Sequence, residues 1–243
     1  TVSITSGGVP NACILNFNVT SYPNPVVNLG NDTAICSGSP LTLYANPGLP
    51  DYIWSDGVTT VDSLVVTAAD TYSVTVSDTN QCAGIDSIIV TENPLPIVNL
   101  GGAITACPGD TVTVDAGVFA SYIWSDGSTN QVLTTNLPAT YTVTVTDING
   151  CEASDLINFT NDTLPVVNIG LDDSLCDGGI KVLNAGAGPY TSYLWSDGTG
   201  FQTATYTVTS DPWVVVEDTN GCFGSDTMHL EIFPTPNVNL GTN

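Results

Sequence analysis

Residues 121–127 read Ser-Tyr-Ile-Trp-Ser-Asp-Gly, and almost the same seven residues occur at 51–57 and at 192–198. The central tryptophans are 70 and 71 residues apart. Repetition at a fixed period indicates that the chain is an array of copies of one small domain. Copies of one domain more often provide length, spacing or multivalent contact than catalysis. The repeated tryptophans are Trp54, Trp124 and Trp195.

The segments around these tryptophans divide the 243 residues into three whole modules and two partial ones. Residues 1–22 match the closing part of a module, and residues 234–243 match the opening part. We expect module 1 at 23–93, module 2 at 94–163 and module 3 at 164–233. Because proline restricts the backbone at each joint, the modules are expected to follow head to tail with limited bending. The partial modules predict a window on a longer array.

Within a module, apolar residues alternate with hydroxylated ones. Tyr141, Val143 and Val145, for example, alternate with three threonines. This period of two is typical of an antiparallel strand with one buried face. Several such strands separated by turn residues predict an all-β fold of immunoglobulin-like sandwiches, each of about 70 residues. Module 3 has Pro212 where the other copies have tyrosine, so we expect a bulge or local repacking there, with Trp213 filling the space.

The charge of the chain excludes several classes of function. There are 24 acidic residues, one lysine and no arginine, which gives a formal net charge of −23. Binding to nucleic acid or to an anionic membrane surface requires Lys and Arg, so neither partner is expected. No apolar run is long enough to span a membrane, so no insertion of this segment is expected. With one histidine as well, the usual groups that activate nucleophiles and stabilise oxyanions are missing, and we expect no enzyme.

Seven cysteines occupy matching places in the copies. We expect one disulfide in each module, and a partner for the remaining Cys13 outside the chain. Buried free thiols and a zinc site are the alternatives, but zinc is disfavoured by the absence of a Cys-x-x-Cys pair. Disulfides predict an oxidising compartment, which is secreted, periplasmic or at the cell surface. The expected pairs are Cys36 with Cys82, Cys107 with Cys151, and Cys176 with Cys222.

Two recurring motifs each have two interpretations. The Trp-Ser-Asp-Gly stretch is either a platform that stacks and hydrogen-bonds a sugar, or a core tryptophan followed by a turn. The Asp-x-Asn-Gly stretch before the second cysteine favours a hairpin turn. Together with an aspartate eight residues further on, it is also a candidate calcium site with oxygen ligands. We expect no cofactor other than this calcium. The calcium candidates are Asp78, Asp147 and Asp218.

The order of motifs along the modules resembles a known class of repeats. Pro-x-Val-x-Leu-Gly, Cys-x-Gly, Tyr-x-Trp-Ser-Asp-Gly and Tyr-x-Val-x-Val-x-Asp-x-Asn-Gly-Cys follow one another. This succession is similar to the immunoglobulin-like and PKD-like repeats of Bacteroidota surface proteins, including gliding-motility adhesins and other substrates of type IX secretion. The resemblance implies an extracellular location at the bacterial cell surface. It also implies O-glycosylation after aspartate, at Thr33, Ser63, Ser87, Thr111, Thr163, Ser174 and Thr227.

From these observations we expect the structural repeat region of a long surface adhesin or filament. Its acidic, disulfide-containing modules are expected to form a stalk or fibre that presents a distal adhesive tip. The expected partners are neighbouring modules of the same chain, further copies in a fibre, and surface glycans. The alternative is that the modules are accessory domains of a secreted protein and bind glycans or surfaces themselves.

Overall fold

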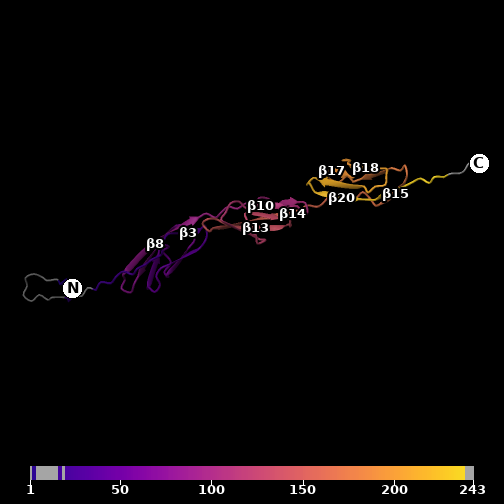
Figure 1. The fold of residues 1–243 in the computed structure, drawn as a ribbon. Coiled ribbons are helices and arrows are strands. Elements are labelled where there is room, and N and C mark those ends of the chain that lie inside the picture. Colours follow the sequence, from indigo (N-terminus) through magenta and orange to yellow (C-terminus); the bar gives the residue numbers. More distant parts are fainter. Residues whose placement is uncertain (1, 4–15, 18–19, 239–243) are drawn as a thin grey trace, which may run out of the picture. The chain divides into compact units, whose positions relative to one another are not determined.

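The computed structural model describes residues 2–3, 16–17 and 20–238. All helices and strands assigned in these residues are β-strands, with no helix among them (Figure 1). The prediction of an all-β fold is therefore confirmed. The chain forms two compact units: Thr1–Ile97 together with Thr146–Glu152, and Val98–Val145 together with Ala153–Asn243. None of the described residues belongs to a helix that could cross a membrane.

Unit 1 contains one complete sandwich. Its larger sheet has the strand order β3-β8-β7-β5, and β4 pairs with β6 in a second sheet. β3 runs parallel to β8, which lies beside it in Figure 1, whereas the other pairs are antiparallel. The strands are β3 (Thr33–Cys36), β4 (Leu41–Tyr44), β5 (Asp51–Trp54), β6 (Ser63–Val66), β7 (Asp70–Ser77) and β8 (Ala83–Asn93), and a short pair precedes them, β1 (Val2–Ser3) with β2 (Asn16–Phe17).

The alternation seen in the sequence decides which side chains fill this sandwich. Val74 and Val76 on β7 have no exposed surface, and they pack with Leu43 on β4 and Val66 on β6. The intervening residues of β7 face outward with their hydroxyl groups. Burial of apolar side chains is the main stabilising contribution to a domain of this size. Each Å² of apolar surface removed from water contributes about 25 cal/mol. The core therefore lies between the two sheets, as in immunoglobulin-like sandwiches.

Unit 2 contains two further sandwiches with separate cores. The first repeats the pattern of unit 1, with the order β11-β13-β14-β9 in one sheet and β10 paired with β12 in the other. β9 runs parallel to β14, as β3 does to β8. Its strands are β9 (Ile104–Ala106), β10 (Val112–Asp115), β11 (Ser121–Trp124), β12 (Val132–Thr135), β13 (Ala139–Thr146) and β14 (Glu152–Asn161).

The last sandwich has a broken final strand. β15 pairs with β21 in parallel, β17, β19 and β20 form a separate sheet, and β16 pairs with β18. The interruption lies at Met228 and His229, opposite Pro212, so the predicted irregularity is present. Its strands are β15 (Asp173–Cys176), β16 (Lys181–Asn184), β17 (Tyr190–Trp195), β18 (Thr203–Tyr206), β19 (Trp213–Asp218), β20 (Phe223–Thr227) and β21 (Leu230–Phe233).

The prediction that Trp213 fills the space beside Pro212 is wrong. Trp213 is 37% exposed, whereas Met228 and Tyr206 are 4% and 7% exposed. In module 2 the corresponding core position is held by Tyr141, whose hydroxyl donates to the carbonyl of Leu137 at 2.9 Å. Such a tyrosine corner is a hallmark of immunoglobulin-like domains. Because proline cannot supply that ring, module 3 places its core tyrosine on β18, one strand earlier, and the burial raises the pKa of Tyr206.

Candidate functional site: bridges between modules

The tryptophans of the repeated motif are core residues. Trp54, Trp124 and Trp195 are only 2%, 2% and 1% exposed. Each indole Nε1 donates to a backbone carbonyl at 2.8 Å, on Val61, Asn130 and Phe201 respectively. A buried indole with a satisfied N–H has no free face for a sugar. The structure therefore supports the core interpretation and not the ligand platform.

The aspartates proposed for calcium hold hairpin turns. Asp147 Oδ1 accepts from the N–H groups of Asn149 at 2.8 Å and Cys151 at 2.9 Å. Gly150, with φ of +82°, permits the sharp turn between them. Asp78 and Asp218 accept the corresponding bonds in their modules. Over the described ranges, His, Cys, Asp and Glu form no group of three or more that could hold a metal, so the calcium prediction gains no support.

A second set of aspartates ties each module's entry segment to its last strands. Asp86, Asp155 and Asp226 accept hydrogen bonds of 2.7 to 2.8 Å from backbone N–H groups near the start of the same module. From the sequence alone, these aspartates were expected only as neighbours of a candidate calcium site. Their repetition at one place in every copy was the available signal of a structural role. The donors are Leu29, Leu100 and Ile169.

The disulfides do not lie within modules. Cys36 is bonded to Cys151, and Cys107 is bonded to Cys222, each with a sequence separation of 115 and a Cα–Cα distance of 5.5 Å. In both cases the first cysteine of one module joins the second cysteine of the next. The predicted pairs Cys36–Cys82, Cys107–Cys151 and Cys176–Cys222 are therefore wrong. Both observed bridges lie inside a compact unit, because the turn that carries Cys151 belongs to unit 1.

The parallel pairing of the first and last strands explains why a bridge within a module cannot form. Cys36 stands opposite Asn93, at the end of β8, whereas Cys82 comes just before β8 begins. β8 has 11 residues. At 3.3 Å per residue the two cysteines are about 36 Å apart along the strand. A disulfide requires Cα atoms within about 7 Å, so they cannot bond.

Hydrogen-bonded turns position both cysteines of each bridge. Cys36 ends β3, and its carbonyl accepts from Ser39 N at 2.8 Å in a tight turn. Cys107 has the same turn, closed by Asp110 N at 3.0 Å. The partner cysteines are held by the hairpin aspartates and are almost completely buried, with 0% exposure for Cys151 and 1% for Cys222.

A polar contact accompanies the second bridge. The side-chain amide of Asn220 donates to the carboxylate of Asp162, which is the residue that follows β14. Asn220 belongs to the same turn as Cys222, and Asp162 lies next to the register partner of Ala106, which precedes Cys107. The joint inside unit 2 is therefore fixed by a covalent bond and a charge-assisted hydrogen bond.

Two cysteines of the described chain have no disulfide partner. Cys82 is partly exposed and Cys176 is exposed. Cys82 is the second cysteine of module 1, and Cys176 is the first cysteine of module 3. Each is therefore equivalent to cysteines that are disulfide-bonded in the other modules. Cys13, predicted to pair outside the chain, lies outside the described residues.

The residues predicted to carry O-glycans are accessible at most positions. Ser63 is half-buried, and the modification remains a prediction. The exposed positions are Thr33, Ser87, Thr111, Thr163, Ser174 and Thr227.

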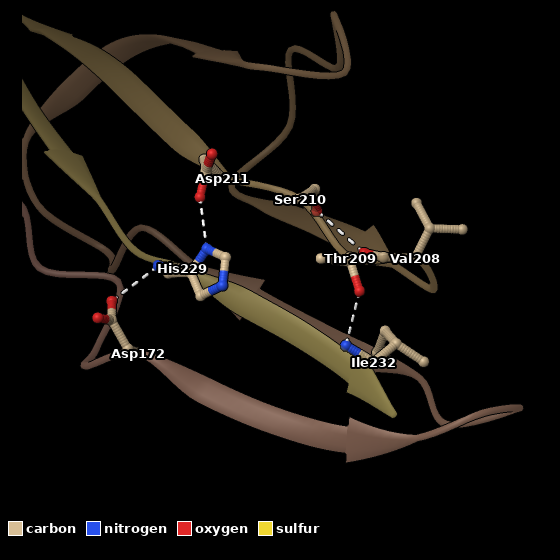
Figure 2. A network of polar contacts seen from close by, with 7 residues as sticks. All are labelled: Asp172, Val208, Thr209, Ser210, Asp211, His229 and Ile232. Carbon is tan, nitrogen blue, oxygen red and sulfur yellow. Dashed lines mark hydrogen bonds and ion pairs between the residues drawn. The ribbon is translucent and has the colours of Figure 1, made fainter. Parts of the chain in front are cut away.

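The single histidine lies at the interruption of the last strand in module 3 (Figure 2). His229 Nδ1 lies 2.6 Å from Asp211 Oδ1, and its backbone N–H donates to Asp172 at 2.7 Å. Beyond the interruption, Thr209 Oγ1 accepts from Ile232 N at 2.8 Å, as Figure 2 also shows. The hydrogen bond to Asp211 raises the pKa of His229. Backbone pairing continues here through the two hydrogen bonds between Ser210 and Leu230, and module 1 has an equivalent contact between Ile89 N and Asp32 at 2.9 Å.

No protein-family model matches the chain, and the comparison with curated proteins gives no match. Among solved structures, the N-terminal eight Ig domains of Down syndrome cell adhesion molecule match 86% of this chain and 40% of their own, with 11% identity and a TM-score of 0.30. A tandem from titin matches 86% of this chain and 100% of its own, with 11% identity and a TM-score of 0.33. SGBP-B of the Bacteroides ovatus mixed-linkage glucan utilization locus, in complex with a heptasaccharide, matches 83% and 66%, with 14% identity and a TM-score of 0.23.

Proposed function

We propose that the chain is the structural part of an extracellular adhesin or filament, in which successive modules are joined twice, by the backbone and by a disulfide. The bridges are the observation that supports this proposal most strongly. A disulfide within a module stabilises that module alone, whereas a disulfide between two modules restricts how far they can separate. A spacer that holds an adhesive tip away from a surface benefits from the second arrangement.

The interleaving of the bridges has a mechanical consequence. Cys36–Cys151 and Cys107–Cys222 enclose overlapping stretches of chain. Tension that enters before Cys36 passes through the sulfur atoms to Cys151, back along the chain to Cys107, and through the second bridge to Cys222. Residues 37–106 and 152–221 therefore lie outside the shortest load path. Most of module 1 lies in the first of these stretches, and most of module 3 lies in the second. The unfolded array is therefore much shorter than the same chain without bridges.

Composition fits an exposed location. The formal net charge of −23 keeps copies apart in solution, and a single lysine offers trypsin-like proteases almost nothing to cut. Disulfides persist in oxidising environments, which supports a secreted or cell-surface protein. The resemblance of the repeats to Bacteroidota surface proteins supports placing it on a bacterial surface.

Electron microscopy of the native full-length protein tests this function. We expect threads with a regular repeat of one module, and a wider distribution of bend angles after reduction with a phosphine. Compact particles with a discrete additional domain, unchanged by reduction, would contradict the proposal and direct the search to that domain.

The alternative function, direct binding of glycans, lost its proposed platform because the three repeated tryptophans are buried. A glycan array probed with the chain distinguishes the two functions. Saturable binding to one class of oligosaccharide supports accessory binding modules, and uniform lack of binding supports the spacer.

A further inference from the structure

We infer that Cys82 and Cys176 are the two halves of further intermodular disulfides, and that each bonds to a module of the same kind. Cys176 bonds to a cysteine that follows an Asp-x-Asn-Gly turn. Cys82 bonds to a cysteine at the end of the first strand of a module. For Cys176 the partner module is either the next one in the same polypeptide or part of a second copy, and for Cys82 it is either the preceding one or part of a second copy. This inference rests on the geometry of the bridges and not on the proposed function.

The turn that carries Cys82 has the geometry of the turns that carry bridged cysteines. Asp78 Oδ1 accepts from Asn80 N at 2.8 Å and Cys82 N at 2.9 Å, which are the distances found for Asp147 in module 2. The N–H of Asp78 also donates to the carbonyl of Cys82 at 3.0 Å. Gln81 has a φ of +65°, where the other copies use glycine. The backbone therefore keeps this conformation even at a residue that rarely adopts it.

Cys176 likewise has the surroundings of a bridged first cysteine. It ends β15, and its carbonyl accepts from Gly179 N at 2.9 Å, in the turn that follows Cys36 and Cys107 as well. Its register partner on the parallel strand is Phe233, which is 49% exposed. An exposed thiol beside an exposed aromatic ring is uncommon in a free-standing domain, because unpaired cysteine and phenylalanine are usually buried.

Burial follows pairing across the repeats, and this observation is independent of backbone geometry. The bridged second cysteines, Cys151 and Cys222, are almost fully buried, whereas the equivalent Cys82 is partly exposed. The bridged first cysteines, Cys36 and Cys107, are partly buried, whereas Cys176 is exposed. Within the described part of the chain, neither unpaired position is therefore covered by a neighbouring module as its equivalents are.

The bond requires an oxidant, which we take to be a small or protein-borne disulfide. The thiolate of Cys176 attacks one sulfur of that disulfide and releases one thiol. The thiol of the incoming cysteine then displaces the second thiol and forms the new S–S bond. Two cysteine thiols lose two protons and two electrons, and the oxidising disulfide gains them as two thiols.

The test extends the chain by one module. A second copy of residues 164–233 is placed after residue 234, in a Cys13→Ser background, and folded in a glutathione redox buffer. We expect Cys176 to bond to the added copy of Cys222, as mapped by mass spectrometry of unreduced peptides. Labelling of Cys176 by a maleimide is expected to fall about tenfold relative to the original chain. A matched chain with serine at the added copy of Cys222 controls for simple covering and should retain the labelling.

The same peptide maps distinguish the two sources of the partner module. A bond from Cys176 to the added copy of Cys222 assigns the next module of the chain. A bond from Cys176 of one molecule to Cys82 of another, in the original Cys13→Ser chain at high concentration, assigns a second copy. If Cys176 stays free or carries only glutathione in both chains, the inference is overturned. Mapping Cys36–Cys151 and Cys107–Cys222 in every sample verifies folding.

Discussion

The loss of one bridge should lengthen the stretched molecule by an amount that reveals the pairing. Consider a chain in the Cys13→Ser background that is pulled from residue 20 and residue 238 until all modules unfold. Without disulfides the roughly 220 residues between these points extend to about 790 Å, at 3.6 Å per residue. With both bridges the shortest covalent path runs from Cys36 to Cys151, back to Cys107, and on to Cys222. That path holds about 76 residues and limits the length to about 270 Å.

The two most informative variants are Cys151→Ser and Cys82→Ser. Removing Cys151 leaves one bridge, so the path grows to about 103 residues and the final length rises by about 100 Å. Removing Cys82 should leave the final length unchanged, because Cys82 has no disulfide partner in the described chain. Bridges within modules predict instead that both variants lengthen the molecule, each by about 160 Å.

Single-molecule optical tweezers measure these lengths directly from force–extension curves. Complete reduction should restore about 790 Å for every variant, which verifies the attachment points. An increase of about 160 Å on Cys82→Ser would refute both the intermodular pairing and the shielding argument that follows from it. Urea melts of both variants establish that the modules fold before they are pulled.

Three further perturbations test the structure of individual modules. Tyr141→Phe removes a buried corner hydrogen bond and should lower the free energy of unfolding by about 1 kcal/mol in urea melts, whereas the exposed Tyr44→Phe should leave it unchanged. Gly84→Ala places a methyl group against the backbone of the segment that enters module 1 and should cost about 1–3 kcal/mol; unchanged stability contradicts that close approach. Since the hydrogen bond to Asp211 raises the pKa of His229, its contribution is fully present below the unfolded value of about 6.5 and is lost as pH rises through the raised pKa. The stability difference between the chain and Asp211→Asn should therefore shrink from pH 6 towards alkaline pH, and a constant difference contradicts the pairing.

The amino-acid sequence by itself determined the repeat, the fold class and most of the turns. A period of about 70 residues implies copies of one domain, and alternation in each copy implies two-layered β-structure. These features are local, because side-chain direction along a strand follows from the backbone alone. The turn at Asp147 to Gly150 was also predictable, since aspartate, asparagine and glycine favour a hairpin wherever they stand.

Only the tertiary structure decided the cysteine partners. Regular spacing showed that the cysteines form pairs, and the simplest pairing was inside each module. The direction in which the first strand pairs with the last is not encoded in any local pattern. Because β3 runs parallel to β8, Cys36 and Cys82 lie at opposite ends of one sandwich, and the bridge forms with the next module instead.

The same division explains the error at Trp213. The sequence showed that proline replaces the corner tyrosine, and it predicted a local irregularity. It did not show which ring occupies the core, because that depends on how strands distant in sequence face one another. Tyr206 on β18 packs against Trp195, with ring centroids 6.5 Å apart, and Trp213 remains at the surface. Local patterns determined the elements of this protein, whereas the contacts between elements and between modules were decided by packing in three dimensions.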